Sequence, residues 1–357
     1  MDSKVILVSP APTNVGGIAS WTGEFMKVLP QYDIGLLLVD TSFIGSENKK
    51  YNNKISIFVE IKRCCKIWWN TLFGLIKNQP QIMHLNTSCS HRGIYRDFIC
   101  AFFAKLFRIK VILHCHCNVK DQLGNDKYAV FCFQTLCSLS SRILVLNQSS
   151  KEYVKEVSNQ KITIMPNFIN DEFVCYKKII NDNIKRIAFV GQVRKSKGVD
   201  SIIEVAKNNK NIIFDLVGPL MSDYNKTILN KIDNIVLHGV QDKEYIKSIL
   251  DNADVFLFPS KSEGFSMALL EAMARGLPII TTDVGANKDM IENQGGVIVP
   301  VDDINAIDAA IKRLSDKSIR EQISCWNTMK VKKNYTLDIV MQKLTDLYKS
   351  NLDVNVR

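Results

Sequence analysis

Two glutamates, Glu263 and Glu271, lie eight positions apart where a glycine-containing loop meets the start of a predicted helix. Three serines before the helix are candidate N-caps, and a Gly-Leu-Pro sequence ends it. The apolar run Val255–Phe258 precedes the loop and predicts a strand. A strand, a loop with glycine and a helix start together make a seat for an anion, because free backbone N–H groups and the helix dipole both attract negative charge.

Residues of this stretch could divide the binding of a nucleotide between them. A phosphate would lie against the backbone, and a carboxylate inside the helix could accept hydrogen bonds from a ribose diol. On this interpretation Glu271 binds the ribose, and Glu263 lies in the loop, nearer the reacting group. The alternative is an ordinary surface helix with one glutamate on it and another in its loop. The N–H groups expected to face the phosphate belong to Gly264, Phe265, Ser266 and Met267.

A second loop follows a predicted strand in the same way: Gly191-Gln-Val-Arg-Lys-Ser-Lys-Gly198 comes after Ile187–Val190. Arg194 and Lys197 could neutralise a diphosphate leaving group, because negative charge grows on that group as the bond to it breaks. The alternative interpretation is a solvated basic loop.

The sequence from Glu263 to Ala286, EGFSMALLEAMARGLPIITTDVGA, resembles the Glu-x7-Glu stretch of retaining GT-B glycosyltransferases. The resemblance is to glycosyltransferase family 4 (the glycosyl transferases group 1 type), a large family of bacterial surface-polysaccharide and lipid-linked-sugar transferases. It covers most of the chain. It implies that Glu263 lies beside the donor sugar, that Glu271 binds the ribose, and that the backbone between them holds the pyrophosphate.

Two further loops are similar to loops of this family. Phe189–Gly198 matches a Gly-Arg-(five residues)-Lys-Gly loop except at Gln192, so Arg194 with Lys197 takes the place of the cations that neutralise the diphosphate. Asn14-Val-Gly-Gly-Ile18 is similar to a Gly-Gly loop near the diphosphate and the acceptor, which implies that role for Gly16 and Gly17. Paired glycines also occur in any tight turn.

The segment Val111-Ile-Leu-His-Cys-His-Cys117 offers four potential metal ligands in a row. Alternation along a strand puts His114 and His116 on one face and Cys115 and Cys117 on the other, so at most two could reach one ion. We expect no metal site. The family has a His at the end of this strand near the donor sugar, which implies that role for His116; the alternative is a hydrogen-bonded core histidine. His84 is expected to be structural.

Short apolar runs alternate with helix-like stretches along the chain, in the βαβ rhythm of parallel sheets. The rhythm occurs twice, and with the resemblance it predicts an α/β protein of GT-B type, with two Rossmann-like doubly wound domains facing a cleft. Ligands bind such sheets beyond the carboxyl ends of the strands, where the three loops lie. The predicted strands are Val5–Val8, Leu36–Val39, Ile55–Val59, Ile82–Leu85, Val111–Leu113, Ile143–Leu146, Ile187–Val190, Ile212–Val217, Ile235–Leu237, Val255–Phe258, Pro278–Thr281 and Val297–Val299.

At 357 residues the chain exceeds the size at which a single core keeps growing, so two domains are expected. The two series of alternating strands and helices meet at Pro166 to Lys185, where Met-Pro-Asn-Phe-Ile-Asn-Asp interrupts the pattern. We predict an acceptor-binding domain (1–165), a hinge (166–185), a donor-binding domain (186–335) and a C-terminal helix (336–357). The resemblance implies that this helix crosses back onto the first domain.

The net charge of +10 is concentrated in residues 1–165, which hold 20 Lys and Arg against 11 Asp and Glu. A helix over Glu60–Lys77 places Ile61, Cys64, Trp68, Leu72 and Leu75 on its core side and Lys62, Lys66, Trp69 and Phe73 on a second stripe. Cations with aromatics suit an anionic membrane surface, although Trp69 and Phe73 could instead pack beneath another element. Arg92 and Arg96 could bind the phosphate of a lipid-linked acceptor, or be surface cations. No nucleic-acid-binding motif is present, so we expect no nucleic-acid partner.

The start of the chain, with Asp2 before an apolar run of only four residues, predicts a strand rather than a signal peptide. We expect a cytoplasmic protein, peripheral on the inner face of the membrane. Ten cysteines at irregular spacing then indicate reduced and mostly buried thiols.

With the resemblance, these patterns predict a glycosyltransferase that needs no metal or other cofactor, because Arg194, Lys197 and the helix start would carry the diphosphate charge. The resemblance implies that the transfer retains the anomeric configuration. Its donor would be a nucleotide sugar, with a UDP-sugar as the default. Its acceptor would be lipid-linked or an oligosaccharide, in cell-surface polysaccharide biosynthesis. Two alternatives stay open, a sugar-nucleotide epimerase of the same fold and a non-catalytic nucleotide-binding subunit.

Overall fold

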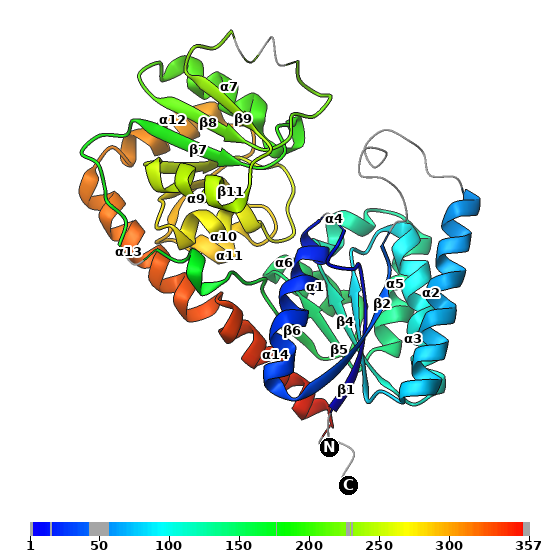
Figure 1. The fold of residues 1–357 in the computed structure, drawn as a ribbon. Coiled ribbons are helices and arrows are strands. Elements are labelled where there is room, and N and C mark those ends of the chain that lie inside the picture. Colours follow the sequence, from blue (N-terminus) through cyan, green and yellow to red (C-terminus); the bar gives the residue numbers. More distant parts are fainter. Residues whose placement is uncertain are drawn as a thin grey trace. The chain divides into compact units, whose positions relative to one another are not determined.

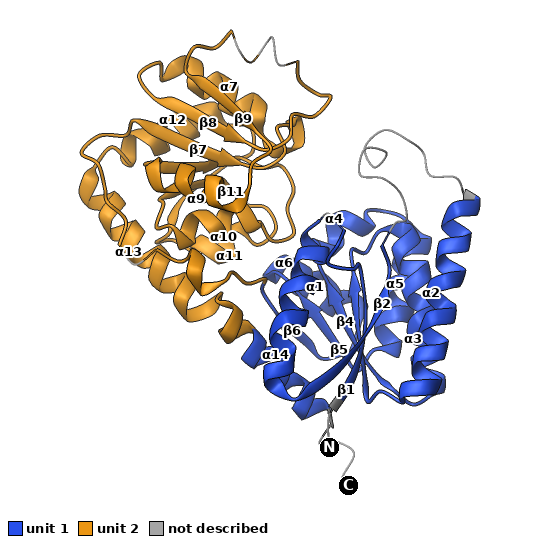
Figure 2. Ribbon diagram, viewed as in Figure 1, with its two compact units in different colours: residues 1–166, 341–357 blue, residues 167–340 orange. Residues whose placement is uncertain are grey.

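The computed structural model describes residues 3–14, 16–42, 57–175, 177–225, 229 and 231–352. The chain forms two compact units, residues 1–166 with 341–357 and residues 167–340 (Figure 2). Each unit is built on its own six-stranded parallel sheet flanked by helices. The predicted α/β fold with two doubly wound sheets is therefore confirmed.

The first unit contains the sheet with strand order β2-β1-β3-β4-β5-β6. Its strands are β1 (Ser3–Ser9), β2 (Ile34–Asp40), β3 (Ile82–Thr87), β4 (Lys110–Cys115), β5 (Arg142–Val145) and β6 (Ile162–Ile164). Its helices up to residue 166 are α1 (Gly17–Val28), η1 (Leu29–Tyr32), α2 (Ile57–Asn78), α3 (His91–Leu106), α4 (Val119–Leu123), α5 (Lys127–Leu139) and α6 (Gln148–Val157).

Different helices cover the two faces of the first sheet (Figure 1). On one face α2, α3 and α5 lie side by side and pack through a continuous apolar core, to which β4 contributes Val111, Leu113 and Cys115. On the other face β4 presents His114, against Trp21 of α1. The last helix, α14 (Leu337–Leu352), reaches the same side, where Tyr348 bonds to His84.

The second unit contains the sheet with order β12-β11-β10-β7-β8-β9. Its strands are β7 (Arg186–Val190), β8 (Ile213–Val217), β9 (Ile235–Gly239), β10 (Val255–Phe258), β11 (Ile279–Thr282) and β12 (Gly296–Val299). Its helices are η3 (Asp171–Phe173), η4 (Lys195–Lys197), α7 (Val199–Asn208), α9 (Lys243–Asn252), α10 (Met267–Ala274), α11 (Asn287–Ile291), α12 (Ile304–Arg313) and α13 (Lys317–Asn334), followed by the start of α14.

Each strand order reverses at one point, and loops diverge there beyond the carboxyl ends of two neighbouring strands. In the second sheet the reversal falls between β7 and β10, which is the strand order of dinucleotide-binding folds. In the first sheet it falls between β1 and β3. Ligands of open α/β sheets bind at such points, so both sheets have a place prepared for one.

Two sequence predictions about elements are wrong. The strand predicted at Ile55–Val59 is not formed, because residues 57–59 begin helix α2, while residues 55–56 lie outside the described part. Ile61, predicted to face the core, is 53% exposed. In addition, the short strand β6 was not predicted from the sequence.

The segment after Pro166 is attached to the second unit. Cys175 N–H donates to the Ala274 carbonyl, and the Lys178 ammonium donates to two carbonyls at the end of α9. Asp254 accepts from Asn181 and from the N–H groups of residues 185 and 186. Residues 167–185 therefore belong to the second unit, and the chain passes between the units at 166/167 and again inside α14.

None of the helices in the described ranges is both long and apolar enough to cross a membrane. The ten cysteines are all free thiols, and only Cys65 and Cys325 are exposed.

Candidate functional site

The loops after β7 and β10 bring Glu263 and Lys197 together. Lys197 Nζ lies 2.5 Å from Glu263 Oε1 and 5.7 Å from the centre of the Phe258 ring. Ser260 Oγ donates to the same Oε1 at 2.7 Å. Both contacts are to Oε1, so one oxygen of this carboxylate is held by a cation and a hydroxyl.

Close backbone contacts fix these loops on one another. Lys261 N–H donates to the Ser196 carbonyl, joining the two loops directly. Gly198 has φ 74°, and a Cβ there would lie 1.9 Å from the Pro259 carbonyl oxygen. A Cβ on Gly285, after β11, would lie 2.2 Å from the Glu263 carbonyl oxygen. Both positions therefore require glycine, and the loop that carries Glu263 is held from two sides.

Helix α10 begins at the position where the sequence predicts an anion-binding site. Ser266 is its N-cap, and its Oγ accepts from Leu269 N–H at 3.2 Å. The Gly264 carbonyl accepts from Ala286 N–H, and the buried Phe265 ring packs against Tyr335. The N–H groups of Met267 and Ala268 precede the first intrahelical bond, and groups of this kind at a helix start suit an anion.

Glu271 lies in the second turn of α10 and is partly buried. Burial raises its pKa to about 7, opposed only by the positive charge of Lys243. No described side chain or backbone group bonds to its carboxylate. A recessed carboxylate without a protein donor is suited to accept hydrogen bonds from hydroxyl groups of a ligand.

Arg194 points toward Gln192, where this chain departs from the family pattern. Its Nη1 lies 3.4 Å from Gln192 Oε1, a weak contact, and its buried Nε has no partner among the described residues. Gly191 precedes this pair with φ 155°. The guanidinium thus keeps donors available at the same loop that carries Lys197.

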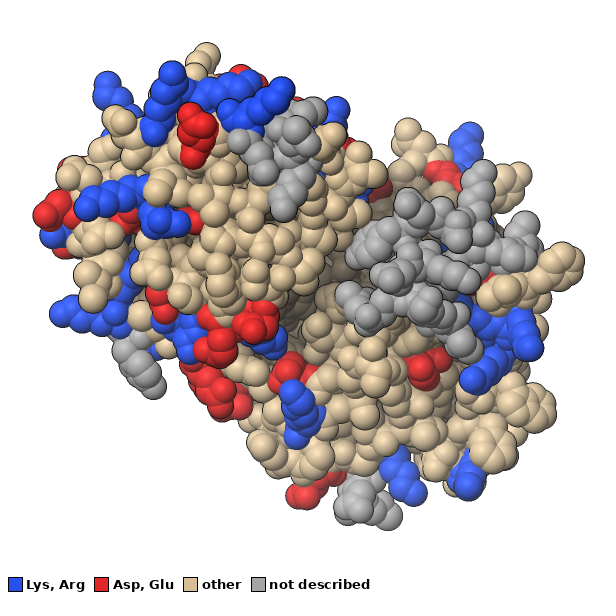
Figure 3. Space-filling model, turned by 45° about the horizontal axis from the view of Figure 1, so that its top comes forward, with Lys and Arg blue, Asp and Glu red and all other residues tan. Residues whose placement is uncertain are grey.

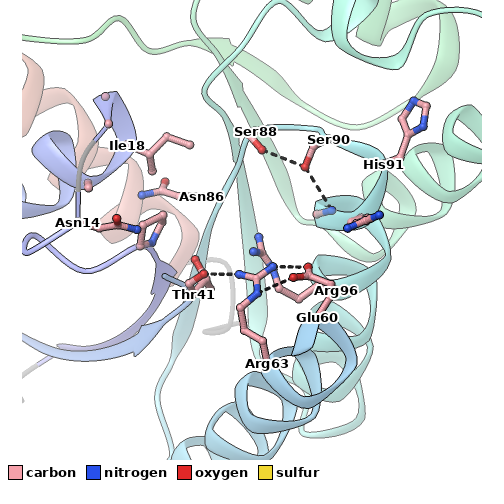
Figure 4. A pocket seen from close by; sticks show the side chains of 16 residues that line it. Asn14, Ile18, Thr41, Glu60, Arg63, Asn86, Ser88, Ser90, His91 and Arg96 are labelled. Atoms are coloured by element: carbon pink, nitrogen blue, oxygen red, sulfur yellow. Dashed lines mark hydrogen bonds and ion pairs between the residues drawn. The ribbon is translucent and has the colours of Figure 1, made fainter. Parts of the chain in front are cut away.

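In the first unit, a pocket of about 520 Å³ lies where the loops after β1 and β3 diverge (Figure 4). Gly16 and Gly17 line it at the start of α1, and no atom lies within 4 Å of where a Cβ on either would be. Ser88 and Ser90 line it at the start of α3. Two helix N-termini thus border one pocket.

Three arginines also line this pocket. Arg92 is exposed. Arg96 is buried and bonds to Asp97 at 2.6–2.7 Å, so it is not a surface cation. Arg63 is buried between Glu60 and the Thr41 carbonyl (Figure 4). The hydroxyl of Thr41 is buried and has no hydrogen-bond partner within the described ranges.

His116 lies beside this pocket in a chain of polar contacts. Its Nε2 is 3.0 Å from Asn86 Oδ1, and Asn86 in turn donates to Ser9. Burial, followed by the charge of His84, lowers the pKa of His116 to about 3. The ring is therefore neutral at physiological pH, and its contact with an amide oxygen leaves Nδ1 as an acceptor.

The neighbouring histidine and cysteine side chains separate as strand alternation predicted. The His114 ring contacts the His116 ring, with centroids 4.0 Å apart and planes tilted by 38°. His114 also bonds to the fully buried His84 at 3.2 Å. Cys115 and Cys117 belong to the core on the opposite face. His84 is a core residue, because its other nitrogen bonds to the Tyr348 hydroxyl.

Sequence reasoning missed several residues of these sites. Ser260 was considered only as a helix cap, and nothing in its surroundings predicts its bond to Glu263. Thr282 and Gly285 were noted only as members of the segment that resembles the family, without a role of their own. In the structure the Thr282 hydroxyl donates to the Ser260 carbonyl, and Gly285 contacts the loop of Glu263. The Glu60–Arg63 pair has an i, i+3 spacing that could have been recognised on the predicted helix.

Comparisons with known proteins agree with this geometry. Residues 175–325 match the family model "Glycosyl transferases group 1". The chain is 27% identical to a capsular polysaccharide biosynthesis glycosyltransferase of Staphylococcus aureus, over 86% of this chain and 88% of that protein. It is 29% identical to an Escherichia coli UDP-Gal:alpha-D-GlcNAc-diphosphoundecaprenol alpha-1,3-galactosyltransferase, over 58% and 60% of the two chains. Among solved structures, a sucrose-phosphate synthase from Thermosynechococcus elongatus superposes with a TM-score of 0.80 at 15% identity, over 99% and 100%.

The two parallel sheets, with loops and helix starts gathered at their reversal points, have GT-B architecture. The family-model match and the named relatives identify the activity as glycosyl transfer. Over residues 175–325 the chain is similar to the glycosyl transferases group 1 family, and the relatives named above are glycosyltransferases.

Proposed function

We propose that this glycosyltransferase moves a sugar, with retention of configuration, from a nucleoside-diphosphate sugar to a hydroxyl of a lipid-linked or glycan acceptor in cell-surface polysaccharide synthesis. The names of the two relatives, one of a capsule and one of a diphosphoundecaprenol-linked sugar, support this class of substrates. The observation that carries the proposal is the Glu263–Lys197–Ser260 group, which lies at the reversal point of the second sheet next to the start of α10.

Different residues of the second unit bind the different parts of the donor. The diphosphate lies against Gly191 and the backbone from Gly264 to Met267, and Glu271 accepts hydrogen bonds from the ribose diol. Glu263 holds a hydroxyl of the donor sugar through its carboxylate. This assignment explains why Glu271 is recessed without a protein partner, since the ribose would supply the missing donors.

Fixed cations stabilise the leaving group. In this proposal Lys197, Arg194 and the start of α10 neutralise the charge that develops on the diphosphate as the glycosidic bond breaks, which the position of both cations in the loop after β7 supports. Three positive groups of this kind make a divalent metal or other cofactor unnecessary. Retention would follow from front-face attack, in which the leaving phosphate helps to deprotonate the acceptor, or from a short-lived covalent intermediate.

The acceptor binds to the first unit, in the pocket between the starts of α1 and α3. Gly16 and Gly17 allow close approach of a phosphate-bearing ligand to the backbone. The exposed Arg92 supplies charge, and Arg96, paired with Asp97, supplies N–H donors at the pocket wall. His116 acts as a neutral hydrogen-bonding group, because a pKa near 3 removes it as an acid at physiological pH. A lipid-linked acceptor would be met at the inner face of the cell membrane, where the basic first unit makes peripheral contact.

The test uses a panel of UDP-, GDP- and dTDP-sugars, first for thermal stabilisation of the purified protein and then for transfer to membrane extract. One of them should raise the melting temperature and be consumed only with acceptor present, equally with and without EDTA. Glu263→Gln should reduce transfer by two orders of magnitude or more, by analogy with loss of one transition-state contact.

The other functions give different results in the same assay. An epimerase would convert the donor without acceptor. A nucleotide-binding subunit would be stabilised by a donor but turn none over. Absence of any thermal shift across the panel would refute the donor site itself.

A further inference from the structure

One face of strands β3 and β4 carries a row of polar side chains inside the first unit. Alternation places His84 and Asn86 of β3 on this face, and the register of the two strands puts Asn86 opposite His114 of β4. His116 follows on the same side. The Trp21 ring of α1 covers all three histidines, at centroid distances of 5.3 to 5.6 Å.

Every histidine of this row is neutral. Burial lowers the pKa of His84 to about 3, and a hydrogen bond to Asn86 only partly opposes this effect. Burial, with the two neighbouring rings, also lowers the pKa of His114. Figure 3 shows Lys, Arg, Asp and Glu side chains at the surface, and the row contains none of these residue types. Each imidazole therefore has one N–H group and one acceptor nitrogen, so each hydrogen bond has a defined direction.

At one end of the row the main chain sets this direction. The Met165 backbone raises the pKa of the His114 ring, as a carbonyl that accepts from it does. His114 Nδ1 lies 3.2 Å from His84 Nε2, so the N–H group that faces the carbonyl is on Nε2. His114 Nδ1 then accepts from His84 Nε2–H. His84 Nδ1 in turn accepts from the hydroxyl of Tyr348 in α14.

At the other end a second main-chain carbonyl has the same effect. The Thr22 hydroxyl donates to the Ile18 carbonyl at 2.9 Å, so its oxygen accepts from the Ser9 hydroxyl at 2.6 Å. Ser9 accepts from Asn86 Nδ2 at 3.0 Å. Asn86 therefore presents its oxygen to His116, and the shared proton belongs to His116 Nε2.

We propose that four buried side chains that do not line the pocket of the first unit are positioning residues for His116: Ser9, Thr22, His84 and Tyr348. They act through the two groups that contact His116, the Asn86 amide and the His114 ring. Together they hold His116 as the Nε2–H tautomer, with Nδ1 as the nitrogen that accepts from a substrate hydroxyl. This inference rests on the proposed function, in which His116 is a hydrogen-bonding group of the site.

The network joins the pocket to the returning helix. Asn86 and Ile18 line the pocket directly (Figure 4). Tyr348 lies in α14, the helix in which the chain passes back from the second unit to the first. The network thus gives α14 a part in substrate binding besides its part in the core of the first unit.

Nitrogen-15 NMR of histidine-labelled protein tests the tautomers. The chain has only five histidines, so their ring signals can be assigned by single substitutions. His84, His114 and His116 should each be neutral at pH 7 with the proton on Nε2. In Tyr348→Phe, His84 should show both tautomers, because its Nδ1 loses its donor. A proton on Nδ1 of His116, or an unchanged His84 in the variant, would overturn the proposal.

A double-variant cycle tests whether Thr22 acts through His116. Thr22→Val removes the hydroxyl that orients Ser9 and should slow transfer by roughly ten- to a hundredfold, because a misplaced group loses its alignment with the substrate. Thr22→Ser keeps the hydroxyl and should retain most of the rate. In His116→Ala, adding Thr22→Val should have no further effect. If the two losses multiply instead, Thr22 acts independently of His116 and the proposal is wrong.

Thr71→Val is the matched control. Thr71 is fully buried in the same unit, and its hydroxyl likewise donates to the carbonyl four residues earlier, that of Ile67. This variant should leave the transfer rate unchanged, and a loss as large as that of Thr22→Val would reduce the network to ordinary packing. If the unaltered enzyme transfers no sugar, the proposed function fails. The NMR experiment needs no substrate and still decides whether the network fixes His116.

Discussion

At the scale of single residues, Glu271 combines a pKa raised to about 7 with the absence of a protein partner in the described chain. Its folded-state pKa lies above the unfolded value, so its contribution to stability is complete below about pH 4.5 and is lost as pH rises to about 7. Glu271→Gln should therefore raise the free energy of unfolding at pH 8 by about 1–2 kcal/mol, allowing for partial solvent exposure, and change it little at pH 4.5. Urea unfolding at both pH values measures this.

The same carboxylate should make donor binding depend on pH. A ribose diol donates to the ionised form, so affinity for the sugar nucleotide should fall as pH drops from 8 to 6. A sugar nucleotide is the right probe because its diphosphate has no ionisation in this range. Glu271→Gln should bind more weakly at pH 8 and without this dependence. An unchanged pH profile in the variant, measured by calorimetry, would exclude Glu271 from the ribose site.

The Lys197–Glu263 pair makes a second prediction at this scale. Lys197→Met leaves a carboxylate that is only 10% exposed without its cation, so the unfolding free energy should fall by about 1–3 kcal/mol. Adding Glu263→Gln should restore most of this stability, because the unpaired charge is gone, but not the rate of transfer. Urea unfolding combined with donor consumption separates the two effects. If the double variant stays as unstable as Lys197→Met, the pair has no structural coupling.

At the scale of elements, glycine holds the two donor loops together. Gly198→Ala should cost about 3 kcal/mol or more, because it adds a clash with the Pro259 carbonyl to the strain of φ 74°. Gly239→Ala, at φ 67° with nothing within 4 Å of the added Cβ, is the control and should cost only about 1 kcal/mol. The unfolding free energies of the two variants are measured in urea. Equal losses of stability in both would contradict a close approach of Gly198 to the Pro259 carbonyl.

The elements also show what the sequence could and could not predict. Eleven of the twelve predicted strands correspond to observed ones, because buried parallel strands are continuous apolar runs. Residues 57–59 misled the prediction, since Ile-Phe-Val is also the start of an amphipathic helix in which Phe58 and Val59 are exposed. Strand β6 was missed because Ile-Thr-Ile is three residues long and half-buried. The ion pair between Lys197 and Glu263 could not be predicted from the spacing of the residues, because β7 and β10 become neighbours only through the strand order.

At the scale of the whole molecule, the chain passes from the first unit to the second and returns through α14. The returning residues are part of the first unit's interior, where Met341, Leu344, Leu347 and Tyr348 are buried. At about 1.5–3 kcal/mol for each large buried side chain, their removal would cost as much as the stability of an ordinary domain. We therefore expect that residues 1–166 do not form a stable unit by themselves.

Truncation after Val340 tests this dependence. Hydrogen exchange should show that amides of β1, β3 and β4 lose protection, while those of β7, β10 and β11 keep it, because residues 167–340 retain their own contacts. Tyr348→Phe in the full chain is the milder comparison. It removes only the hydroxyl that bonds to His84 and should cost about 1–3 kcal/mol, within the first unit alone. Equal loss of protection in both sheets would mean instead that the two units unfold as one cooperative body.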